Sequence, residues 1–515
     1  MDERRFALAV SMCFAAVIGV GLMNHEMWRD ELQAWLIARG SRSLSELIYL
    51  VTAEGHPALW HLLLYPLSRV TADPAVMQVL HLILATCVVY IASRHAPFPR
   101  WQRVLLACSY FLAFEYAVIS RSYVLAPLSL FSICALASTE RRTYIPVALL
   151  LVVLANTSAY GLLVAGAVSA GLIVDAWTRW RGWQHLRRRL PIQALIIVLL
   201  GAALSAGQIL AEKSPSSGDR RPRTDRPPPS TQWKAAESLG LVSRAYVPIP
   251  RATESLPAWW NRTITDSKTK WSMVAGVILS VALLAVFGMS LLDRPAALTL
   301  LVSGTLSIVF VSYAFHRGGM RHYGHLFLVL VAALWLARVL PGAALSGRLG
   351  RIAAAFRRPA FIAFALVLGA QSVAAGLYLG ADLDRPFSSA RETAEFLEDL
   401  PLDRVLIAST ENLAGSSVSA YLRTPIFYMN TQSFGTYSDW RLRWYPTSQA
   451  LPVLRRLLSA GEYHNLVIIS GRPLPDWLAS GNEDGWVFDE IARFDEAIVG
   501  SERFLVYRAR LLPPE

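Results

Sequence analysis

The sequence has little charge for its length, and this shortage excludes an ordinary soluble protein. Charged residues make up 17% of the 515 residues, whereas hydrophobic residues make up 54% and the mean hydropathy is +0.39. This apolar share exceeds that of typical soluble domains. We therefore expect an integral membrane protein, long enough for a multi-span domain and one soluble domain.

Cysteine and lysine are also scarce. The four cysteines lie inside apolar stretches without a CxxC pair, so neither a disulfide framework nor a zinc site is expected. Only four lysines occur among the 49 basic residues, and the net charge is +12. Genome composition can produce such an arginine bias, so the charge is no evidence of nucleic-acid binding, and we expect no nucleic-acid partner.

Apolar runs long enough to cross a membrane are abundant. A crossing needs roughly 20 apolar residues, and about eleven such transmembrane helices are expected near residues 6–23, 74–93, 103–120, 122–139, 143–157, 160–178, 191–211, 271–292, 296–315, 324–341 and 359–380. No A-x-A-like cleavage site follows the first run, which favours a retained anchor. The run at 56–70 is short for a crossing, so we expect an interfacial or re-entrant helix there.

Arginine placement predicts the orientation of these helices. Five arginine-rich segments fall on one side of the membrane, and short cytoplasmic loops carry such an excess. They lie at residues 4–5, 94–103, 141–142, 179–189 and 338–358. We therefore expect a multi-pass protein of a bacterial inner (plasma) membrane whose first loop, 24–73, faces outward.

The same assignment predicts four domains or segments. They are a transmembrane module with its first outer loop at 1–211, a large extracytoplasmic loop at 212–270, further transmembrane helices at 271–385 and an extracytoplasmic α/β domain at 386–515. The proline- and charge-rich stretch 214–230 predicts a mobile loop.

The segment 386–515 alternates strand and helix patterns, which is typical of a small α/β domain. Strands are expected at 405–409, 426–429, 466–470 and 503–508, and helices at 391–400, 416–422 and 452–460. The segment has no GxGxxG, P-loop or catalytic-triad signature. We expect an accessory domain, with acceptor recognition as one role.

The first outer loop carries the residues best suited to chemistry. The helical spacing of apolar residues at 28–39 predicts an amphipathic helix on the membrane surface, with Asp30 and Glu31 at its start. The two carboxylates either complement the helix dipole or form part of a catalytic site with Glu54 and His56.

Other polar residues fall on the same predicted side. Glu115 and Arg121 form either a structural ion pair or part of the site, because ionisable groups at membrane depth default to a functional role. The stretch 316–325 is either a solvated turn or a phosphate-binding cluster. The candidate binding residues are Arg121, Tyr123, His316, Arg317, Arg321, His322 and Tyr323, together with His325.

These residue types suit a transfer from a phosphate-bearing lipid. A carboxylate can accept the proton of an acceptor hydroxyl, while arginine and histidine stabilise the charge on the departing phosphate. No cofactor is required for this chemistry. Whether a divalent cation takes part is left open, since Asp30, Glu31 and Glu54 could hold one through oxygen ligands.

The motifs of this half of the chain resemble a known group. The Asp-Glu pair in the first outward loop, the E-x-H-P motif at Glu54-Gly55-His56-Pro57 and the later Ser120-Arg121-Ser122-Tyr123 look like those of the polyprenyl-phosphate-sugar-dependent GT-C glycosyltransferases. The closest patterns are those of the protein O-mannosyltransferases and the lipid A aminoarabinose transferases. The resemblance covers roughly residues 1–211.

The resemblance implies a GT-C-like polytopic α-helical membrane fold and an inverting hexosyl- or pentosyltransferase. The donor would be a polyprenyl-phosphate-linked sugar, and the acceptor an envelope glycan, lipid or protein. Asp30 would be the catalytic carboxylate, Glu31 its partner, and Glu54 part of the donor or acceptor pocket. The aminoarabinose transferases have E-K-P-P where this chain has Glu54-Gly55-His56-Pro57, so His56 or the 316–325 cluster would replace that lysine.

Two other classes compete with an enzyme. A transporter or flippase of a lipid-linked sugar should show internal repeats and polar groups near the midplane, whereas the polar clusters here lie towards one face. A non-catalytic assembly protein would keep the fold for binding alone, with no catalytic role for the carboxylates.

Overall fold

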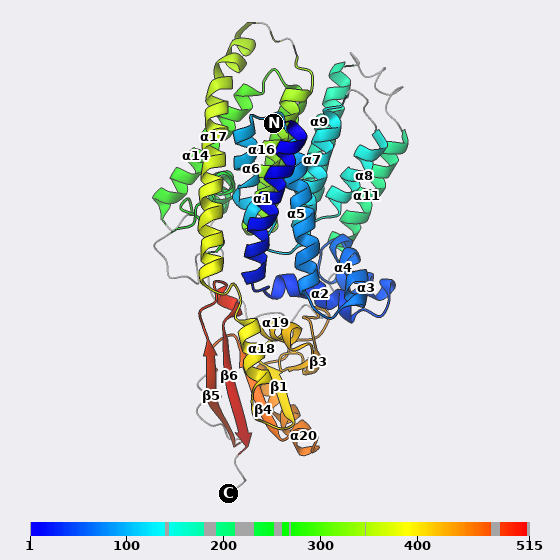
Figure 1. Cartoon of the computed structure of the whole chain (residues 1–515), viewed down its shortest axis with the longest axis vertical. Coiled ribbons are helices and arrows are strands. Elements are labelled where there is room, and N and C mark those ends of the chain that lie inside the picture. Colours follow the sequence, from blue (N-terminus) through cyan, green and yellow to red (C-terminus); the bar gives the residue numbers. More distant parts are fainter. Residues whose placement is uncertain are drawn as a thin grey trace.

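The chain forms a helical bundle with a smaller mixed α/β domain at one end (Figure 1). The structure, a computed structural model, describes residues 2–139, 144–179, 192–211, 231–251, 260–266, 269–343, 345, 347–474 and 485–511. The predicted mobile loop 214–230 lies outside these residues. A multi-span membrane domain followed by a soluble-type domain agrees with the expected fold class.

Eight of the described helices are long and apolar enough to cross a membrane. They are α1 (Glu3–Asn24), α5 (Ala75–His95), α9 (Ala159–Arg179), α11 (Ile192–Leu210), α14 (Lys270–Ser290), α15 (Pro295–Ala314), α16 (Met320–Val339) and α17 (Gly347–Asp384). Helix α16 is the most deeply buried of them, so it forms the centre of the bundle. Each of the eight coincides with a predicted span.

The other three predicted spans differ from expectation. The spans at 122–139 and 143–157 form the shorter helices α7 (Leu125–Ala137), after the 3-10 turn η2 (Ser122–Val124), and α8 (Tyr144–Ala155). The third, 103–120, is not one helix: α6 (Arg100–Ala107) ends and a π-turn, η1 (Phe111–Glu115), follows. Fewer long spans therefore occur in the described residues than the eleven expected.

The break after α6 has a local cause and a structural support. The Ser109 hydroxyl donates to the Leu106 carbonyl at 2.6 Å, which competes with the helix ladder. Further on, Nδ1 of His81 on α5 donates to the Ala117 carbonyl at 3.0 Å. Non-helical backbone at membrane depth is tolerated where protein covers it, and residues 109–120 are buried.

Three short helices lie across the end of the bundle that faces the C-terminal domain (Figure 1). They are α2 (Arg29–Gly40), α3 (Leu44–Thr52) and α4 (Leu59–Val70). Helix α2 matches the amphipathic helix predicted at 28–39, and α4, with 12 residues, is too short to cross a membrane. Two more short helices, α12 (Thr231–Leu239) and α13 (Leu241–Tyr246), pack against α14, α15 and α16.

The C-terminal domain is built on a six-stranded sheet in the order β3-β2-β1-β4-β6-β5. The strands are β1 (Val405–Ser409), β2 (Ile426–Tyr428), β3 (Ser433–Gly435), β4 (Asn465–Ser470), β5 (Trp486–Phe494) and β6 (Phe504–Leu511). Strand β1 is parallel to β2 and β4, and the other pairs are antiparallel. All four predicted strands are present; β3 and β5 are additional.

Helices cover both faces of this sheet. The helices are α18 (Ala390–Glu398), α19 (Asn412–Leu422) and α20 (Leu451–Ser459), with short 3-10 turns at Thr447–Ala450 and Gly500–Glu502. Along β4, Val467 and Ile469 face α18 and α19, while Leu466 and Ile468 face α20. Successive strand residues point to opposite faces, so the apolar run of β4 fits a strand buried on both sides. Helix α19 also packs on α2 and joins the two domains.

Candidate active site

The side chain of Asp30, in the first turn of α2, lies among three arginine side chains. Its Oδ2 atom lies 2.9 Å from Nη1 of Arg121 and 3.2 Å from Nη2 of Arg321, and Oδ1 lies 3.7 Å from Nε of Arg29. Burial alone would raise the pKa of Asp30, but Arg121 and Arg321 lower it below its usual value. The side chain keeps 26% of its exposure. Asp30 is therefore an ionised carboxylate that a ligand can reach.

Arg121 is held in place through its backbone. The Arg121 amide donates to Nε2 of His81 at 3.2 Å, while the opposite ring nitrogen of His81 bonds the Ala117 carbonyl. The guanidinium lies over the ring of Tyr123, with its central carbon 5.4 Å from the ring centroid. Because the strand-like backbone here is pinned to α5, the Arg121 side chain reaches across to α2.

A pocket opens beside this ion pair. Its lining comes from α2, from the start of α4 and from the turn before α7, and consists of Asp30, Gln33, Ala34, Glu54, His56, Pro57, Trp60, His61, Arg121, Ser122 and Tyr123. We call it the transfer pocket. Asp30, Glu54, His56, Arg121 and Tyr123, five of the residues singled out in the sequence, meet here.

Glu54 is the second carboxylate of the transfer pocket. Its Oε1 atom accepts from Nε2 of Gln33 at 2.9 Å. Burial, with a contribution from the nearby charge of Asp30, raises the pKa of Glu54 to about 7. The pocket thus pairs a carboxylate whose pKa is lowered with one that titrates near neutrality.

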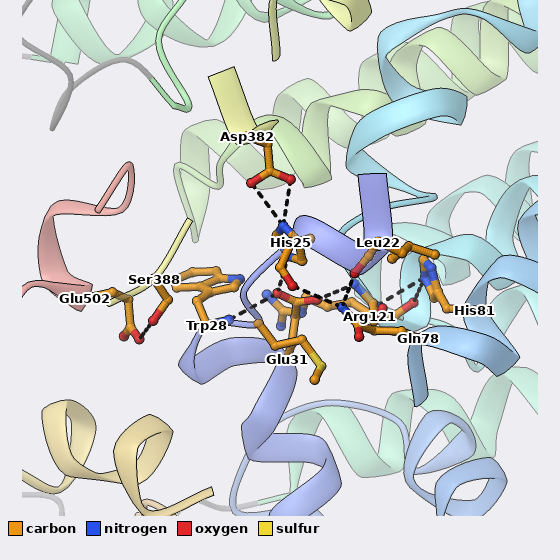
Figure 2. A network of polar contacts seen from close by, with 12 residues as sticks. Leu22, His25, Trp28, Glu31, Gln78, His81, Arg121, Asp382, Ser388 and Glu502 are labelled. Carbon is orange, nitrogen blue, oxygen red and sulfur yellow. Dashed lines mark hydrogen bonds and ion pairs between the residues drawn. The ribbon is translucent and has the colours of Figure 1, made fainter. Parts of the chain in front are cut away.

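Glu31, by contrast, points away from the transfer pocket into a buried network (Figure 2). Its Oε2 atom accepts from the Trp28 amide at 3.2 Å and lies 3.1 Å from Nε2 of His25, and its Oε1 atom accepts from the Ser120 amide at 2.6 Å. Successive residues of a helix point about 100° apart, which separates Glu31 from Asp30. The helix-start interpretation thus describes the bond of Glu31 to the Trp28 amide, whereas its bonds to His25 and Ser120 were not expected.

His25 joins this network to the last helix of the bundle. Its Nδ1 atom lies 2.9 Å from Oδ2 of Asp382 at the end of α17, on the side opposite Glu31 (Figure 2). Burial lowers the pKa of His25, but the two carboxylates outweigh it and raise the pKa to about 10. A protonated imidazole between two buried carboxylates therefore fixes the start of α2 against α17.

The first turn of α16 supplies the other side of the site. The Gly319 amide donates to Nδ1 of His322 at 2.8 Å, so Nε2 carries the proton and donates to the Tyr123 hydroxyl at 3.0 Å. Next to it, Arg321 reaches Asp30 and lies over the ring of Trp28, at 5.8 Å from the centroid. Arg321 and His322 thus contact two residues that line the transfer pocket, Asp30 and Tyr123.

The rest of the predicted 316–325 cluster lies elsewhere. His316, Arg317 and Tyr323 line a separate pocket between α12, α15 and the start of α16, together with Lys234. Arg317 forms an ion pair there with Glu237. His325 is buried among aromatic rings, 5.8 Å from the ring of Tyr160. The structure therefore divides the cluster into residues that contact Asp30 and Tyr123, residues that line the second pocket and a histidine in the bundle interior.

Of the two interpretations of Glu115 and Arg121, the ion pair between them is not formed. Glu115 instead accepts from the Tyr110 hydroxyl at 2.5 Å and from Nε1 of Trp260 at 3.4 Å, while Arg121 pairs with Asp30. The sequence suggested about one and a half helical turns between the two residues. Because the helix ends at the π-turn, that spacing does not hold.

The carboxylates do not converge into a metal site. Within the described ranges, no group of three or more His, Cys, Asp and Glu side chains could hold a metal ion. Asp30 and Glu54 share the transfer pocket, but Glu31 faces His25. The three-carboxylate arrangement considered from the sequence is therefore not formed.

Several residues of the site gave no signal in the sequence. Gln33 and His61 lie in helical patterns where a polar residue is ordinary, and His25 and Gln33 also bond the distant Asp382 and Ser438. These pairs are separated by hundreds of residues. The polar intrusions of Gln78 and His81 into an apolar span were the only available hint.

The C-terminal domain also reaches the site. Arg29, next to Asp30, lies 3.9 Å from Oε1 of Glu502, whose Oε2 accepts from the Ser388 hydroxyl at 2.9 Å (Figure 2). The Tyr421 hydroxyl of α19 donates to the Met27 carbonyl at 3.3 Å. The start of α2 thus contacts both the C-terminal domain and the helical bundle.

A solved structure of similar fold exists for this chain. No family model matches the chain, and neither does any curated protein. The solved structure of ArnT from Cupriavidus metallidurans bound to undecaprenyl phosphate is similar with a TM-score of 0.51 and 12% identity, covering 99% of this chain and 98% of that chain. The apo structure of the same protein gives 0.47 and 14%, with the same coverage. The first likeness shows that the chain shares the fold of this ArnT over nearly its whole length, including the C-terminal domain, which agrees with the expected fold class.

Proposed function

We propose that this protein is a membrane glycosyltransferase that moves a sugar from a polyprenyl-phosphate carrier to an acceptor hydroxyl on the outer side of a bacterial inner membrane. The observation that carries the proposal is Asp30, a reachable carboxylate between the guanidinium groups of Arg121 and Arg321 at a pocket. A base beside two phosphate-binding cations is what this transfer requires. The ArnT of similar fold binds undecaprenyl phosphate.

The proposed reaction is a single displacement that inverts the sugar's anomeric centre. The acceptor oxygen attacks the anomeric carbon, the bond from that carbon to the phosphate oxygen breaks, and the acceptor's proton passes to Asp30. Arg121 and Arg321 stabilise the charge on the departing polyprenyl phosphate. The lowered pKa of Asp30 makes it a weak base. The phosphate leaves readily without a strong base to drive the attack. The acceptor hydroxyl becomes acidic as its oxygen bonds the anomeric carbon, so a weak base is enough to take its proton.

The remaining pocket residues have assisting roles in this proposal. His56 follows Gly55, which stands where the E-K-P-P motif has its lysine. His56 would contact the donor phosphate together with Tyr123 and His322. Glu31 acts as a positioning residue, since it fixes the turn that presents Asp30. For His316, Arg317 and Tyr323, a contact with the lipid phosphate stays a prediction, now assigned to the second pocket.

The deciding experiment uses the purified protein in lipid bilayers with labelled polyprenyl-phosphate sugars and crude envelope acceptors. Transfer of label to an acceptor supports the enzyme. Label that crosses the bilayer while still attached to its lipid would instead establish a transporter. A protein that binds the donor but does neither would be the non-catalytic alternative.

Replacing Arg321 with lysine should weaken donor binding. Lysine keeps the charge but loses the planar fork that can grip phosphate with two N–H groups. We expect the dissociation constant for the polyprenyl-phosphate sugar to rise roughly tenfold, with acceptor preference unchanged. The matched control is Arg338→Lys at the other end of α16, where the guanidinium bonds the Pro97 carbonyl. Equal donor affinity in wild type and Arg321→Lys would remove α16 from the donor site.

Glu54 should make donor binding depend on pH near neutrality. Its pKa of about 7 means that it is neutral below that pH and anionic above it. An anionic Glu54 repels the donor phosphate, so the donor KM should rise roughly tenfold between pH 6 and pH 8. In Glu54→Gln, which can still accept from Gln33, this rise should disappear. The exposed Glu490→Gln serves as control, and a pH profile that persists in Glu54→Gln would contradict the assignment.

A further inference from the structure

A short aromatic segment of the C-terminal domain reaches the rim of the transfer pocket. It runs from Tyr437 to Tyr445, between β3 and α20, with the sequence Tyr-Ser-Asp-Trp-Arg-Leu-Arg-Trp-Tyr. We call it the rim segment. Four of its nine residues are aromatic and two are arginines. No role in the reaction described above has been given to it.

Backbone hydrogen bonds fix the rim segment to α2. The side-chain amide of Gln33 donates to the Ser438 carbonyl at 2.8 Å and accepts from the Ser438 amide at 3.0 Å. Gln33 itself lines the transfer pocket and bonds Glu54. The same amide group therefore joins the rim segment, the pocket wall and the second carboxylate.

Side-chain packing against α2 and α3 adds to this attachment. Arg441 lies over the ring of Tyr49 on α3, with its central carbon 4.7 Å from the ring centroid, and forms an ion pair with Asp439. The Tyr437 ring packs on α2 at Gly40, where an added Cβ would lie 3.2 Å from a ring carbon. The rim segment is thus a built part of the pocket mouth rather than a loose loop.

Two tryptophans of the segment, Trp440 and Trp444, stack next to a residue that lines the pocket. The side chain of Trp440 is hydrogen-bonded to Glu54, a lining residue of the pocket. The rings of Trp440 and Trp444 are nearly parallel, at 15° with centroids 6.3 Å apart. Both residues are half-buried, and the intervening Leu442 and Arg443 are exposed. The pair therefore extends from Glu54 outward to solvent.

We propose that Trp440 and Trp444 form the acceptor subsite and that the acceptor presents a sugar ring to them. This inference rests on the proposed function and specifies its substrate class. A pyranose ring carries C–H groups on its faces and hydroxyls at its edge. The electron-rich face of an indole ring attracts such weakly positive C–H groups. The hydroxyl edge of a ring placed on Trp440 would then face Glu54 and Asp30.

A protein acceptor fits the segment less well. An extended peptide needs backbone partners such as an open strand edge, whereas the backbone of Ser438 is already bonded to Gln33. A purely apolar acceptor would gain little from a rim of two arginines and an aspartate. A stacking surface next to carboxylates suits a ligand with an apolar face and a polar edge, and saccharides have this shape.

The binding test uses fluorine NMR of the full-length protein labelled with 5-fluorotryptophan. Trp440→Phe and Trp444→Phe identify the two resonances among those of the 16 tryptophans. Chitobiose, maltose and cellobiose are the probes, and a peptide of similar mass is the comparison. We expect at least one disaccharide to shift both resonances, with no shift at the exposed Trp271. Shifts caused by the peptide instead, or no shift by any disaccharide, would overturn the proposal.

The kinetic test separates acceptor binding from folding. Trp444→Ala should raise the acceptor KM about 10- to 30-fold with the donor KM unchanged, and Trp444→Phe should recover most of that loss. Phe434→Ala, on β3 of the same domain, is the matched control. A fall in kcat with an unchanged acceptor KM would show that the pair is only structural. If the wild type transfers no sugar at all, the proposed function fails, while the NMR spectra still decide whether the pair binds sugar.

Discussion

Replacing Asp30 with asparagine is expected to abolish sugar transfer while leaving the protein folded. Asparagine keeps the shape of the side chain but removes both the base and the negative charge. Loss of a general base typically costs about 10²- to 10⁴-fold in rate. The two guanidinium groups left behind, Arg121 and Arg321, keep 16% and 21% of their exposure, so water can still solvate them. The loss should therefore appear in kcat and not in thermal stability.

The matched control for this variant is Asp293→Asn. Asp293 also lies between arginines, with Oδ2 at 2.6 Å from Nη2 of Arg357 and 3.8 Å from Nε of Arg294, but α15 separates it from the site. We expect Asp293→Asn to transfer sugar normally. The measurement is single-turnover transfer from a labelled polyprenyl-phosphate sugar, with donor binding recorded in parallel. Normal turnover in Asp30→Asn would rule out Asp30 as the base.

Much of the transfer pocket was predictable because its residues lie close to one another in sequence motifs. The Asp-Glu pair and the E-x-H-P motif sit in one loop, and Arg121 and Tyr123 lie two residues apart. The separate roles of Asp30 and Glu31 were not predictable. Adjacent carboxylates look alike in a sequence, and only the position of His25 and Ser120 in space shows which one is buried.

The division of the 316–325 cluster has a similar cause. Helix α16 begins at Met320, so Arg321, His322 and Tyr323 project about 100° apart around its axis. Arg321 therefore reaches Asp30, His322 reaches Tyr123, and Tyr323 lines the second pocket. The residue at which this helix begins is uncertain from the sequence alone, so the sequence could not show that these three side chains point in different directions. The first turn of α16 consequently contacts residues of the transfer pocket through Arg321 and His322 and lines the second pocket with Tyr323.

Hydropathy predicted the membrane helices correctly except where polar contacts hold the backbone in another conformation. Apolar length identified all eight long helices, but it also predicted a helix at 103–120, where the bonds of Ser109 and His81 hold a different backbone. In the C-terminal domain, β5 was missed because its burial pattern is mostly intermediate and the charged Asp489, Glu490 and Arg493 interrupt its apolar residues. Edge strands with one wet face carry a weaker apolar signal than central strands such as β4.

His25→Leu is expected to give the largest loss of stability. Leucine removes the cation that separates Glu31 from Asp382, so two fully or nearly fully buried carboxylates face each other with no positive charge between them. Removing one partner of a buried ionic group costs about 3–5 kcal/mol. Transfer activity should fall with it, because the turn that presents Asp30 depends on Glu31. The exposed His464→Gln should change neither property.

The pH dependence of stability separates the charge of His25 from its packing. The folded protein raises the pKa of His25 from 6.5 to about 10. The stabilisation from the charge of His25 is therefore complete below pH 6.5 and declines as the pH rises towards 10. Between these values only the folded state keeps the proton on His25, so folding must take up a proton that becomes scarcer as the pH rises. Thermal unfolding in detergent between pH 6 and pH 9 should show this decline in wild type and not in the variant that combines His25→Leu with Glu31→Gln and Asp382→Asn, which has no titrating group in the network. Adding Glu31→Gln and Asp382→Asn to His25→Leu should recover part of the stability, since amides tolerate burial without a cation. If the triple variant is no more stable than His25→Leu, packing and not charge holds α2 against α17.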